Sequence, residues 1–265
     1  MINTAQAAWL GLVQGITEFL PISSSGHLVL GQRLLGLKET ELLFDVSVHV
    51  GTLAAVLFFF RDDLWSMLRG LWAHDQAARQ GRRLLWLVVW GSLPTAALGL
   101  LFKDLFESLF ASTYAVGIAL IFTGLLLTLT RFSPAQGRGL AETGLGRALL
   151  IGLAQGLAIV PGLSRSGTTI SAGLLLGLDR RLAAHYSFVL SVPAILGALF
   201  LQLYGLEPQT QVVLAPLLIG GAVAAASGYL ALKLLLKVVR RGKLHWFAPY
   251  CIILGLTALG WSWWG

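Results

Sequence analysis

The 265-residue sequence has little charge: only 12% of its residues are Asp, Glu, Lys or Arg, whereas 56% are hydrophobic. Water-soluble domains carry about 25% charged residues. The mean hydropathy is +0.78, and the apolar residues gather in several long runs. These observations exclude an ordinary soluble domain. They predict an all-α polytopic membrane protein whose apolar runs cross the lipid bilayer as helices.

Cysteine is nearly absent, since Cys251 is the single one and lies in an apolar run. An intramolecular disulfide is therefore excluded. The N-terminus lacks a basic region followed by a small-residue cleavage site, so we expect the first apolar segment to remain in the mature protein. The net charge of +7 could suggest nucleic-acid binding. However, the Lys and Arg residues cluster between apolar runs, as the positive-inside bias predicts, and we expect no nucleic-acid partner.

Six apolar runs are long enough to span a bilayer core, which needs about 20 residues. They cover roughly residues 44–60, 84–102, 112–130, 182–204, 212–236 and 246–264. Most basic residues fall in four stretches that we place in the cytoplasm: 61–83, 131–147, 180–181 and 233–243. The connections at 103–111 and 205–211 carry only Lys103, so we place them on the outer side.

Two stretches are too short to span. Residues 148–178 lie between two basic segments and are broken by "PGLSRSGTT". Each half is about 13 residues, or about 20 Å of helix, which is less than a bilayer core of about 30 Å. We therefore predict a re-entrant helical hairpin that enters from the cytoplasm. Residues 5–36 repeat this pattern around "PISSSGH", and here the hairpin enters from the outer side.

The two hairpins share sequence. "GLVQGITEFLPISSSGH" (11–27) aligns without gaps with "GLAQGLAIVPGLSRSGT" (152–168), and seven of the 17 positions are identical. Repeated sequence combined with opposite entry predicts an inverted-topology repeat. We therefore expect a single membrane domain, 1–265, built from the halves 1–130 and 131–265. Paired, interrupted short helices of this kind indicate where the functional site lies.

Both breaks contain groups that attract anions. Because Ser is a favoured N-cap, the second helix of each hairpin should begin at the Ser cluster, and a helix N-terminus attracts phosphate. Arg165 lies within the second break, and Arg binds phosphate oxygens bidentately. The hydroxyls that we expect near a bound phosphate are those of Ser23, Ser25, Ser164 and Ser166. For each of these serines the alternative is a purely capping role.

Glu18 and His27 add groups that anion binding alone does not require. Glu18 follows Gln14 by four residues, so both lie on one helix face. A carboxylate repels an anion, but hydrolysis uses one to hold a divalent metal or to accept a proton. His27 can act as general acid, general base or nucleophile. The combination predicts hydrolysis of a phosphate ester or anhydride. The alternatives are a structural bond from Glu18 to a helix N-cap or to Arg165, and a satisfied core position for His27.

"QGITEFLPISSSGH" and "PGLSRSGTT" resemble the two signature motifs of the undecaprenyl-diphosphate phosphatase family, also called bacitracin-resistance proteins. The likeness extends along nearly the whole chain. It implies hydrolysis of a C55 polyprenyl diphosphate to the monophosphate, which recycles the lipid carrier for peptidoglycan synthesis and gives bacitracin resistance. It further implies a multi-pass protein of the bacterial cytoplasmic (inner) membrane, with a site open to the outer face, a divalent cation (Mg²⁺ or Ca²⁺) and a homodimer.

The resemblance also implies roles for individual residues. Glu18 is the essential acidic residue and a candidate metal ligand, and Gln14 is its partner. Ser24 and His27 are candidates for nucleophile and base. The residues expected to bind the diphosphate are Ser164, Arg165 and Thr169. Gln14 stands where many relatives have Glu, so the first motif brings one carboxylate, and the diphosphate would supply most of the metal ligands.

Two other functions share some of these sequence features. A transporter or flippase of a lipid phosphate would share inverted repeats and broken helices, but the Glu18–His27 pair has no evident use in transport. A phosphatase related to phosphatidic acid phosphatases needs an Arg-Pro motif, which the sequence lacks. Such a phosphatase also needs His and Asp shortly after Ser-Arg. The next His after Arg165 is His185, and no Asp follows it, so this class is excluded.

Overall fold

The computed structural model describes residues 2–34, 42–134, 136–204 and 213–264, and the regular elements in these ranges are all helices. The first half contains α1 (Thr4–Phe19), α2 (Ser24–Leu34), α3 (Leu42–Phe59), α4 (Arg61–Arg69), α5 (Gln76–Leu101), α6 (Lys103–Phe110) and α7 (Thr113–Leu129). After the short helices η1 (Thr130–Phe132) and η2 (Leu140–Glu142) come α8 (Leu145–Leu157), α9 (Arg165–Leu175), α10 (Arg180–Tyr204), α11 (Leu214–Arg240), η3 (Leu244–Phe247) and α12 (Ala248–Trp264).

The apolar helices confirm a multi-pass membrane protein. Five helical segments, containing α5, α7, α10, α11 and α12, are long and apolar enough to cross a membrane. The pair of α3 and α4, bent by 69°, brings the number to six. These helices correspond to the six runs expected from the sequence. The outer connection predicted at 205–211 lies outside the described residues.

Two short helices, α4 and α6, were not expected. They occupy the connections predicted at 61–83 and 103–111. Each is amphipathic and buries one large apolar side chain, Met67 in α4 and Phe106 in α6. Burial of one apolar face stabilises such a helix even where its composition is too polar to span a bilayer.

Glycines bring the helix backbones close together. A Cβ atom on Gly11 of α1 would lie 2.4 Å from the carbonyl oxygen of Gly220 in α11. At the equivalent position of the sequence repeat, a Cβ on Gly152 of α8 would lie 1.8 Å from the carbonyl oxygen of Gly91 in α5. Small residues at helix crossings allow this approach in membrane proteins. The repeated glycines thus allow the first helix of each pair, α1 or α8, to pack closely against a long helix, α11 or α5.

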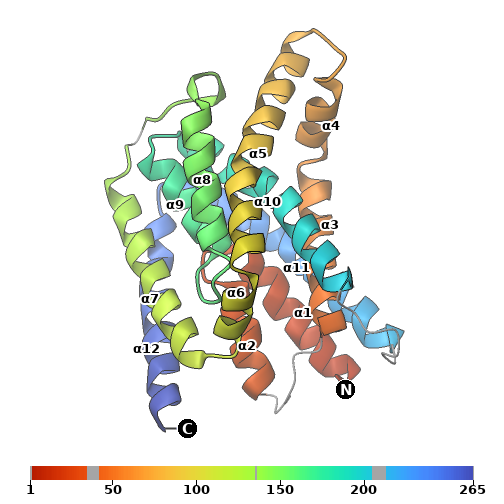
Figure 1. Ribbon diagram of the computed structural model, residues 1–265, viewed down its shortest axis with the longest axis vertical. Helices are drawn as coiled ribbons and strands as arrows, with labels where there is room; N and C mark the ends of the chain where they lie inside the picture. Colours follow the sequence, from red (N-terminus) through yellow and green to blue (C-terminus); the bar gives the residue numbers. More distant parts are fainter. Residues whose placement is uncertain (1, 35–41, 135, 205–212, 265) are drawn as a thin grey trace.

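The two pairs of short helices lie in opposite halves of the molecule (Figure 1): α1 and α2 are in the lower half of the view, and α8 and α9 are in the upper half. Their lengths are 16 and 11 residues in the first pair, and 13 and 11 residues in the second. This matches the helix pairs expected around residues 5–36 and 148–178. Their re-entry into the bilayer and the division into two inverted halves stay predictions.

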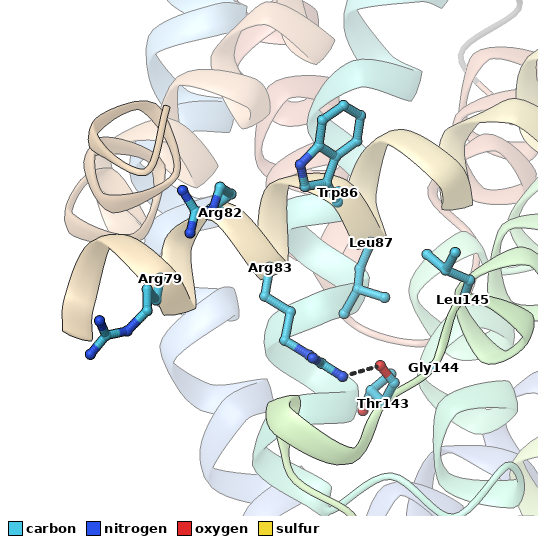
Figure 2. Close-up of a pocket in the computed structure, with 8 residues that line it drawn as sticks. All are labelled: Arg79, Arg82, Arg83, Trp86, Leu87, Thr143, Gly144 and Leu145. Carbon is cyan, nitrogen blue, oxygen red and sulfur yellow. Dashed lines mark hydrogen bonds between the residues drawn. The ribbon is translucent and has the colours of Figure 1, made fainter. Parts of the chain in front are cut away.

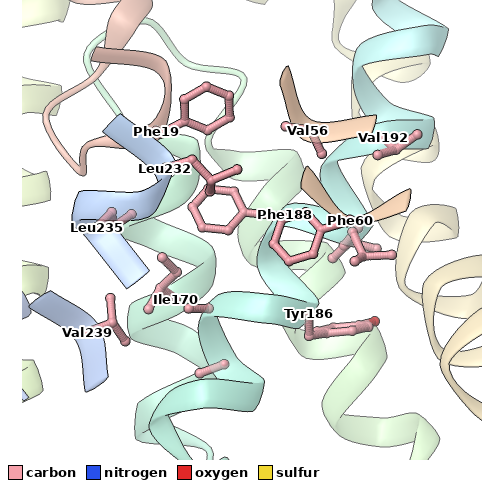
Figure 3. Close-up of a cluster of buried hydrophobic side chains, with 14 of the residues drawn as sticks. Phe19, Val56, Phe60, Ile170, Tyr186, Phe188, Val192, Leu232, Leu235 and Val239 are labelled. Carbon is pink, nitrogen blue, oxygen red and sulfur yellow. The ribbon is translucent and has the colours of Figure 1, made fainter. Parts of the chain in front are cut away.

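The main hydrophobic core lies beside the turns of these pairs. Figure 3 shows Phe19 of α1, Phe188 of α10, Ile170 of α9 and Leu232 of α11 packed together. Phe19 and Phe188 meet edge to face with ring centroids 5.8 Å apart. Because Phe19 directly follows Glu18, this packing fixes the end of α1 that carries the carboxylate.

Candidate functional site

The turn between α1 and α2 packs against the turn between α8 and α9. Ser166 Oγ donates to the carbonyl oxygen of Leu20 at 3.3 Å. A Cβ on Gly167 would lie 3.2 Å from Pro21 Cβ, and one on Gly26 would lie 3.5 Å from Gly162 Cα. Two sequence segments about 141 residues apart therefore form one site.

Each turn contains a residue in the left-handed backbone region. Ser23 has φ +68° and Gly162 has φ +94°. A Cβ on Gly162 would also lie 2.4 Å from the carbonyl oxygen of Val116, so glycine suits this position on both counts. Thr123 of α7 completes the second turn: its hydroxyl donates to Gly162 O at 3.1 Å and accepts from Ser164 N at 3.1 Å.

Glu18 is the centre of the site. Its carboxylate is buried, with 8% of the residue exposed. Oε2 accepts hydrogen bonds from Gln14 Nε2 at 2.9 Å and from Ser24 Oγ at 2.5 Å. Oε1 forms an ion pair with Arg165 of α9. The prediction that Gln14 and Glu18 share one helix face is confirmed. The bond from Glu18 to Arg165, which is the structural alternative for Glu18, is also present.

The expected helix starts are confirmed, since α2 begins at Ser24 and α9 begins at Arg165. Ser164 Oγ accepts from Gly167 N at 3.1 Å, and Ser23 Oγ accepts from Gly26 N at 3.3 Å. The hydroxyls of Ser25 and Ser166 lie 3.3 Å from those of Ser23 and Ser164, respectively. These four serines therefore shape the two N-termini, whose partial positive charge favours an anion.

His27 lies in the first turn of α2, and its ring nitrogens face partners other than the Ser24 hydroxyl. Its Nδ1 lies 2.7 Å from the carbonyl oxygen of Ser23, and its Nε2 lies 2.6 Å from the hydroxyl of Tyr250 in α12. Ser24 is instead bonded to Glu18. Among the described residues, no hydrogen bond joins His27 to Ser24, so the structure gives no support to an activation of Ser24 by His27. Glu18, by contrast, lies within hydrogen-bond distance of Ser24 Oγ and can accept its proton.

Thr169 is fully buried. Its hydroxyl lies 2.5 Å from that of Ser187 in α10 and donates to Arg165 O at 2.8 Å. A diphosphate contact from Thr169, as the family resemblance implies, would require these bonds to be exchanged.

Two buried polar atoms at the site lack a partner within the described ranges: Arg165 Nη1 and Gln14 Oε1. A buried guanidinium N–H without a partner is costly, and a phosphate oxygen would satisfy it. Gln14 Oε1 is an acceptor that a cation or a substrate hydrogen can satisfy. The site thus retains free hydrogen-bonding capacity for a ligand.

The sequence did not indicate His49 as a neighbour of Glu18. This residue of α3 is half-buried and close enough for a Coulombic interaction with the Glu18 carboxylate. Its Nδ1 lies 2.7 Å from the backbone oxygen of Asp45. No short motif joins His49 to Glu18, so only their packing brings them together.

The site offers few oxygen donors for a metal ion. Among the residues that the structure describes, no three His, Cys, Asp or Glu side chains form a group that could hold a metal ion. Glu18 and Gln14 Oε1 are hard oxygen donors of the kind that Mg²⁺ and Ca²⁺ prefer. They fit a cation whose remaining ligands come from substrate oxygens and water.

A separate pocket of about 370 Å³ lies near the start of α5 (Figure 2). Arg83 Nε donates to Leu140 O at 2.8 Å and its Nη2 to Thr143 O at 3.1 Å. The lining residues are Arg79, Arg82, Arg83, Trp86, Leu87, Thr143, Gly144 and Leu145, and none was predicted as a site residue. Through these two hydrogen bonds Arg83 links α5 to the segment that precedes α8.

Residues 7–257 match the family described as bacitracin resistance protein BacA. The chain belongs to this family. Relatives named undecaprenyl-diphosphatase include one from Carboxydothermus hydrogenoformans, 47% identical and covering 97% of both chains. One from Desulfatibacillum aliphaticivorans is 46% identical over 94% of this chain and 95% of its own. One from Korarchaeum cryptofilum is 42% identical over 97% and 99%. The BacA match includes both turns of the site.

Proposed function

We propose that this chain is an undecaprenyl-diphosphatase, which hydrolyses undecaprenyl diphosphate to undecaprenyl phosphate and inorganic phosphate. The observation that carries this proposal is the buried carboxylate of Glu18, shared between the Ser24 hydroxyl and the Arg165 guanidinium. This arrangement supports Ser24 as the nucleophile, Glu18 as the base and Arg165 as the anion-binding group, close to the N-termini of α2 and α9. The names of the BacA-family relatives support the same reaction.

The diphosphate would bind where α2 and α9 begin. Arg165 Nη1 is free to donate to a phosphate oxygen, and the N-termini of both helices add favourable partial charge. The prenyl chain stays in the lipid. Because Arg165 also neutralises Glu18, it offsets the repulsion between that carboxylate and the substrate.

In the chemical step, Ser24 Oγ attacks the terminal phosphorus while Glu18 accepts its proton. The new O–P bond forms as the bond from phosphorus to the bridging oxygen breaks, and undecaprenyl phosphate leaves. Water then attacks the phosphoserine, the bond between Ser24 Oγ and phosphorus breaks, and Ser24 regains a proton. Since charge spreads over the phosphate oxygens during transfer, Arg165 contributes mainly electrostatic stabilisation. His27 would orient water or assist proton transfer in the second step.

We further propose that a divalent cation, Mg²⁺ or Ca²⁺, binds together with the diphosphate, with Glu18 and Gln14 Oε1 as the protein's oxygen donors. When bound, it would neutralise charge on the substrate oxygens. A transporter or flippase of a polyprenyl phosphate is not favoured, because the named relatives are diphosphatases.

The location of the protein also belongs to the proposal. The basic segments indicate a cytoplasmic (inner) membrane orientation in which the hairpin of α1 and α2 begins and ends on the outer side, so the site would open outward. There, hydrolysis would regenerate the lipid carrier of peptidoglycan synthesis and confer bacitracin resistance. The homodimer rests on the family resemblance alone, and chemical cross-linking in membranes would test it.

The experiment measures phosphate release from undecaprenyl diphosphate by the purified protein in detergent, with and without a chelator. Lipid binding is measured in parallel. We expect cation-dependent release by the wild type and by Glu107→Gln, a control carboxylate exposed on α6. Release should be lost in Glu18→Gln and strongly reduced in His27→Ala. If the wild-type protein bound the lipid but released no phosphate with any cation, the proposed hydrolase function would be wrong.

A further inference from the structure

The contact between His27 and Tyr250 joins residues 223 positions apart in the sequence. The Tyr250 hydroxyl lies 2.6 Å from His27 Nε2, and the two rings stack with centroids 5.7 Å apart and an interplanar angle of 6°. Tyr250 is 47% exposed. The stacking and the hydrogen bond together restrict both the plane of the imidazole and the direction of Nε2.

The second ring nitrogen determines what this hydrogen bond means. His27 Nδ1 faces the backbone oxygen of Ser23 at 2.7 Å, and a carbonyl oxygen only accepts hydrogen bonds. The neutral imidazole therefore carries its hydrogen on Nδ1, and the Nε2 lone pair accepts the Tyr250 O–H. Because a phenol both donates and accepts, the contact also persists when Nε2 carries a proton.

The neighbouring residue of α12 supports the same turn. Cys251 is fully buried, and its thiol donates to the carbonyl oxygen of Pro21 at 3.4 Å. Two consecutive side chains of α12 therefore contact the region of the α1–α2 turn: Cys251 bonds to Pro21 near the start of the turn, and Tyr250 bonds to His27 just after it.

Helix α12 is in turn fixed to α7. A Cβ on Gly255 would lie 2.7 Å from Gly117 O, and one on Gly124 would lie 2.9 Å from Ala248 O, so the two backbones are in close contact. Helix α7 holds the other turn through Thr123. The pair of α7 and α12 thus forms one frame that supports both turns of the site.

We propose that Tyr250 is a positioning residue of the active site, which fixes the ring plane and the Nε2 direction of His27 for proton transfer. This role rests on the proposed hydrolase function, whereas the contact itself does not. The nearest conservative change, Tyr250→Phe, keeps the stacked ring and removes the hydroxyl. Tyr114→Phe is the matched control, because Tyr114 is similarly exposed, at 57%, near the start of α7.

The test has a chemical readout that is independent of activity. Diethyl pyrocarbonate acylates an imidazole nitrogen that has a free lone pair, so the Tyr250 hydroxyl should protect Nε2. The acylation rate of His27 is measured at neutral pH by mass spectrometry of its peptide, with the exposed His74 as internal reference. We expect Tyr250→Phe to raise the His27/His74 rate ratio about fivefold, an amount typical of losing one hydrogen bond, and Tyr114→Phe to leave it unchanged.

The kinetic readout separates positioning from binding. Since the contact serves proton transfer, Tyr250→Phe should lower kcat about tenfold and change KM by less than about twofold. An unchanged acylation ratio overturns the proposal, as does a raised ratio with unchanged kcat. If the wild type hydrolyses nothing, the hydrolase is contradicted, and the acylation ratio alone still decides whether Tyr250 holds His27.

Discussion

The two turns of the site have the same scaffold and different chemistry. At the positions where the first turn has Glu18, Ser24 and His27, the second has Ile159, Arg165 and Thr168. The capping serines and the packed glycines are the same in both. In the first repeat Gln14 donates to Glu18, whereas its equivalent, Gln155, donates to Thr95 Oγ1 at 3.2 Å and Leu190 O at 3.4 Å.

This difference shows how two helix pairs with similar sequences can form one asymmetric site. The shared residues form the turns and the anion-attracting helix starts, which both halves need. In the proposed reaction the residues that differ have different roles: the first turn supplies the carboxylate and the nucleophile, and the second supplies the positive charge. Each half alone would hold an unpaired buried charge, because Glu18 and Arg165 neutralise each other across the two turns.

The largest expected effect comes from removing that charge pairing. Arg165→Ala should lower kcat/KM by about 10³-fold or more, as removal of an arginine that stabilises phosphoryl transfer does. It should also lower the free energy of unfolding by about 3 kcal/mol, because Glu18 is left as an uncompensated buried charge. Phosphate release and thermal unfolding in detergent measure both. Arg165→Lys should recover most of the stability and little of the activity, since Lys lacks the bidentate fork. Equal recovery of both would contradict the assigned role.

Exchange of the nucleophile should affect activity alone. Ser24→Ala removes the hydroxyl that donates to Glu18 and should lower kcat by about 10²–10⁴-fold with little change in melting temperature. The control is Ser108→Ala on α6, whose hydroxyl donates to the carbonyl oxygen of Leu105 and whose loss should leave kcat near the wild-type value. Comparable losses in the two variants would argue against Ser24 as the nucleophile.

The two glutamines should respond in opposite ways to the same change. Gln14→Glu adds a carboxylate beside Glu18 and should lower the divalent-cation concentration that gives half-maximal activity by about tenfold. Gln155→Glu places a charge against the carbonyl oxygen of Leu190 and should cost about 3 kcal/mol of stability. Cation titrations and thermal unfolding distinguish them. A Gln14→Glu variant with unchanged cation dependence would remove Gln14 from the cation site.

The smallest effects concern the left-handed residues of the turns. Gly162→Ala meets Val116 O at a positive φ and should cost about 1–3 kcal/mol. Ser23→Gly loses a cap but gains a residue suited to φ +68°, so its free energy of unfolding should change by no more than the few tenths of a kcal/mol typical of a Gly cap. If the two variants were equally destabilised, backbone strain would not be what distinguishes these turns.

The sequence predicted those parts of the molecule that depend on local pattern. Long apolar runs specify spanning helices, and Pro and Ser clusters specify breaks and helix starts, so the six spans and the starts of α2 and α9 could be predicted. The repeat predicted that the two turns converge, whereas the contact between Glu18 and Arg165 was expected only as a structural alternative. The N-terminal boundary of α5 was not predicted, because the helix begins with two polar turns that precede the apolar run.

The partners of the site residues could not be predicted in the same way. Tyr250 and Thr123 reach the turns from long helices, and no motif or spacing links them to Glu18 or His27. The preference of Ser24 for Glu18 over His27 depends on how α2 is rotated in its turn. That rotation is fixed by the positive φ of Ser23 and by the packing of α12, neither of which leaves a signal in the local sequence.

The most direct test of the central claim, that the two turns form one hydrolytic site, is a double-mutant cycle across them. Phosphate release is measured for the wild type, Glu18→Gln, Arg165→Ala and the double variant. Because both residues serve one reaction centre, we predict that each single change removes nearly all activity and that the double variant is no worse than the more damaged single one. Multiplicative losses, or either single variant with near wild-type release, would contradict a shared site.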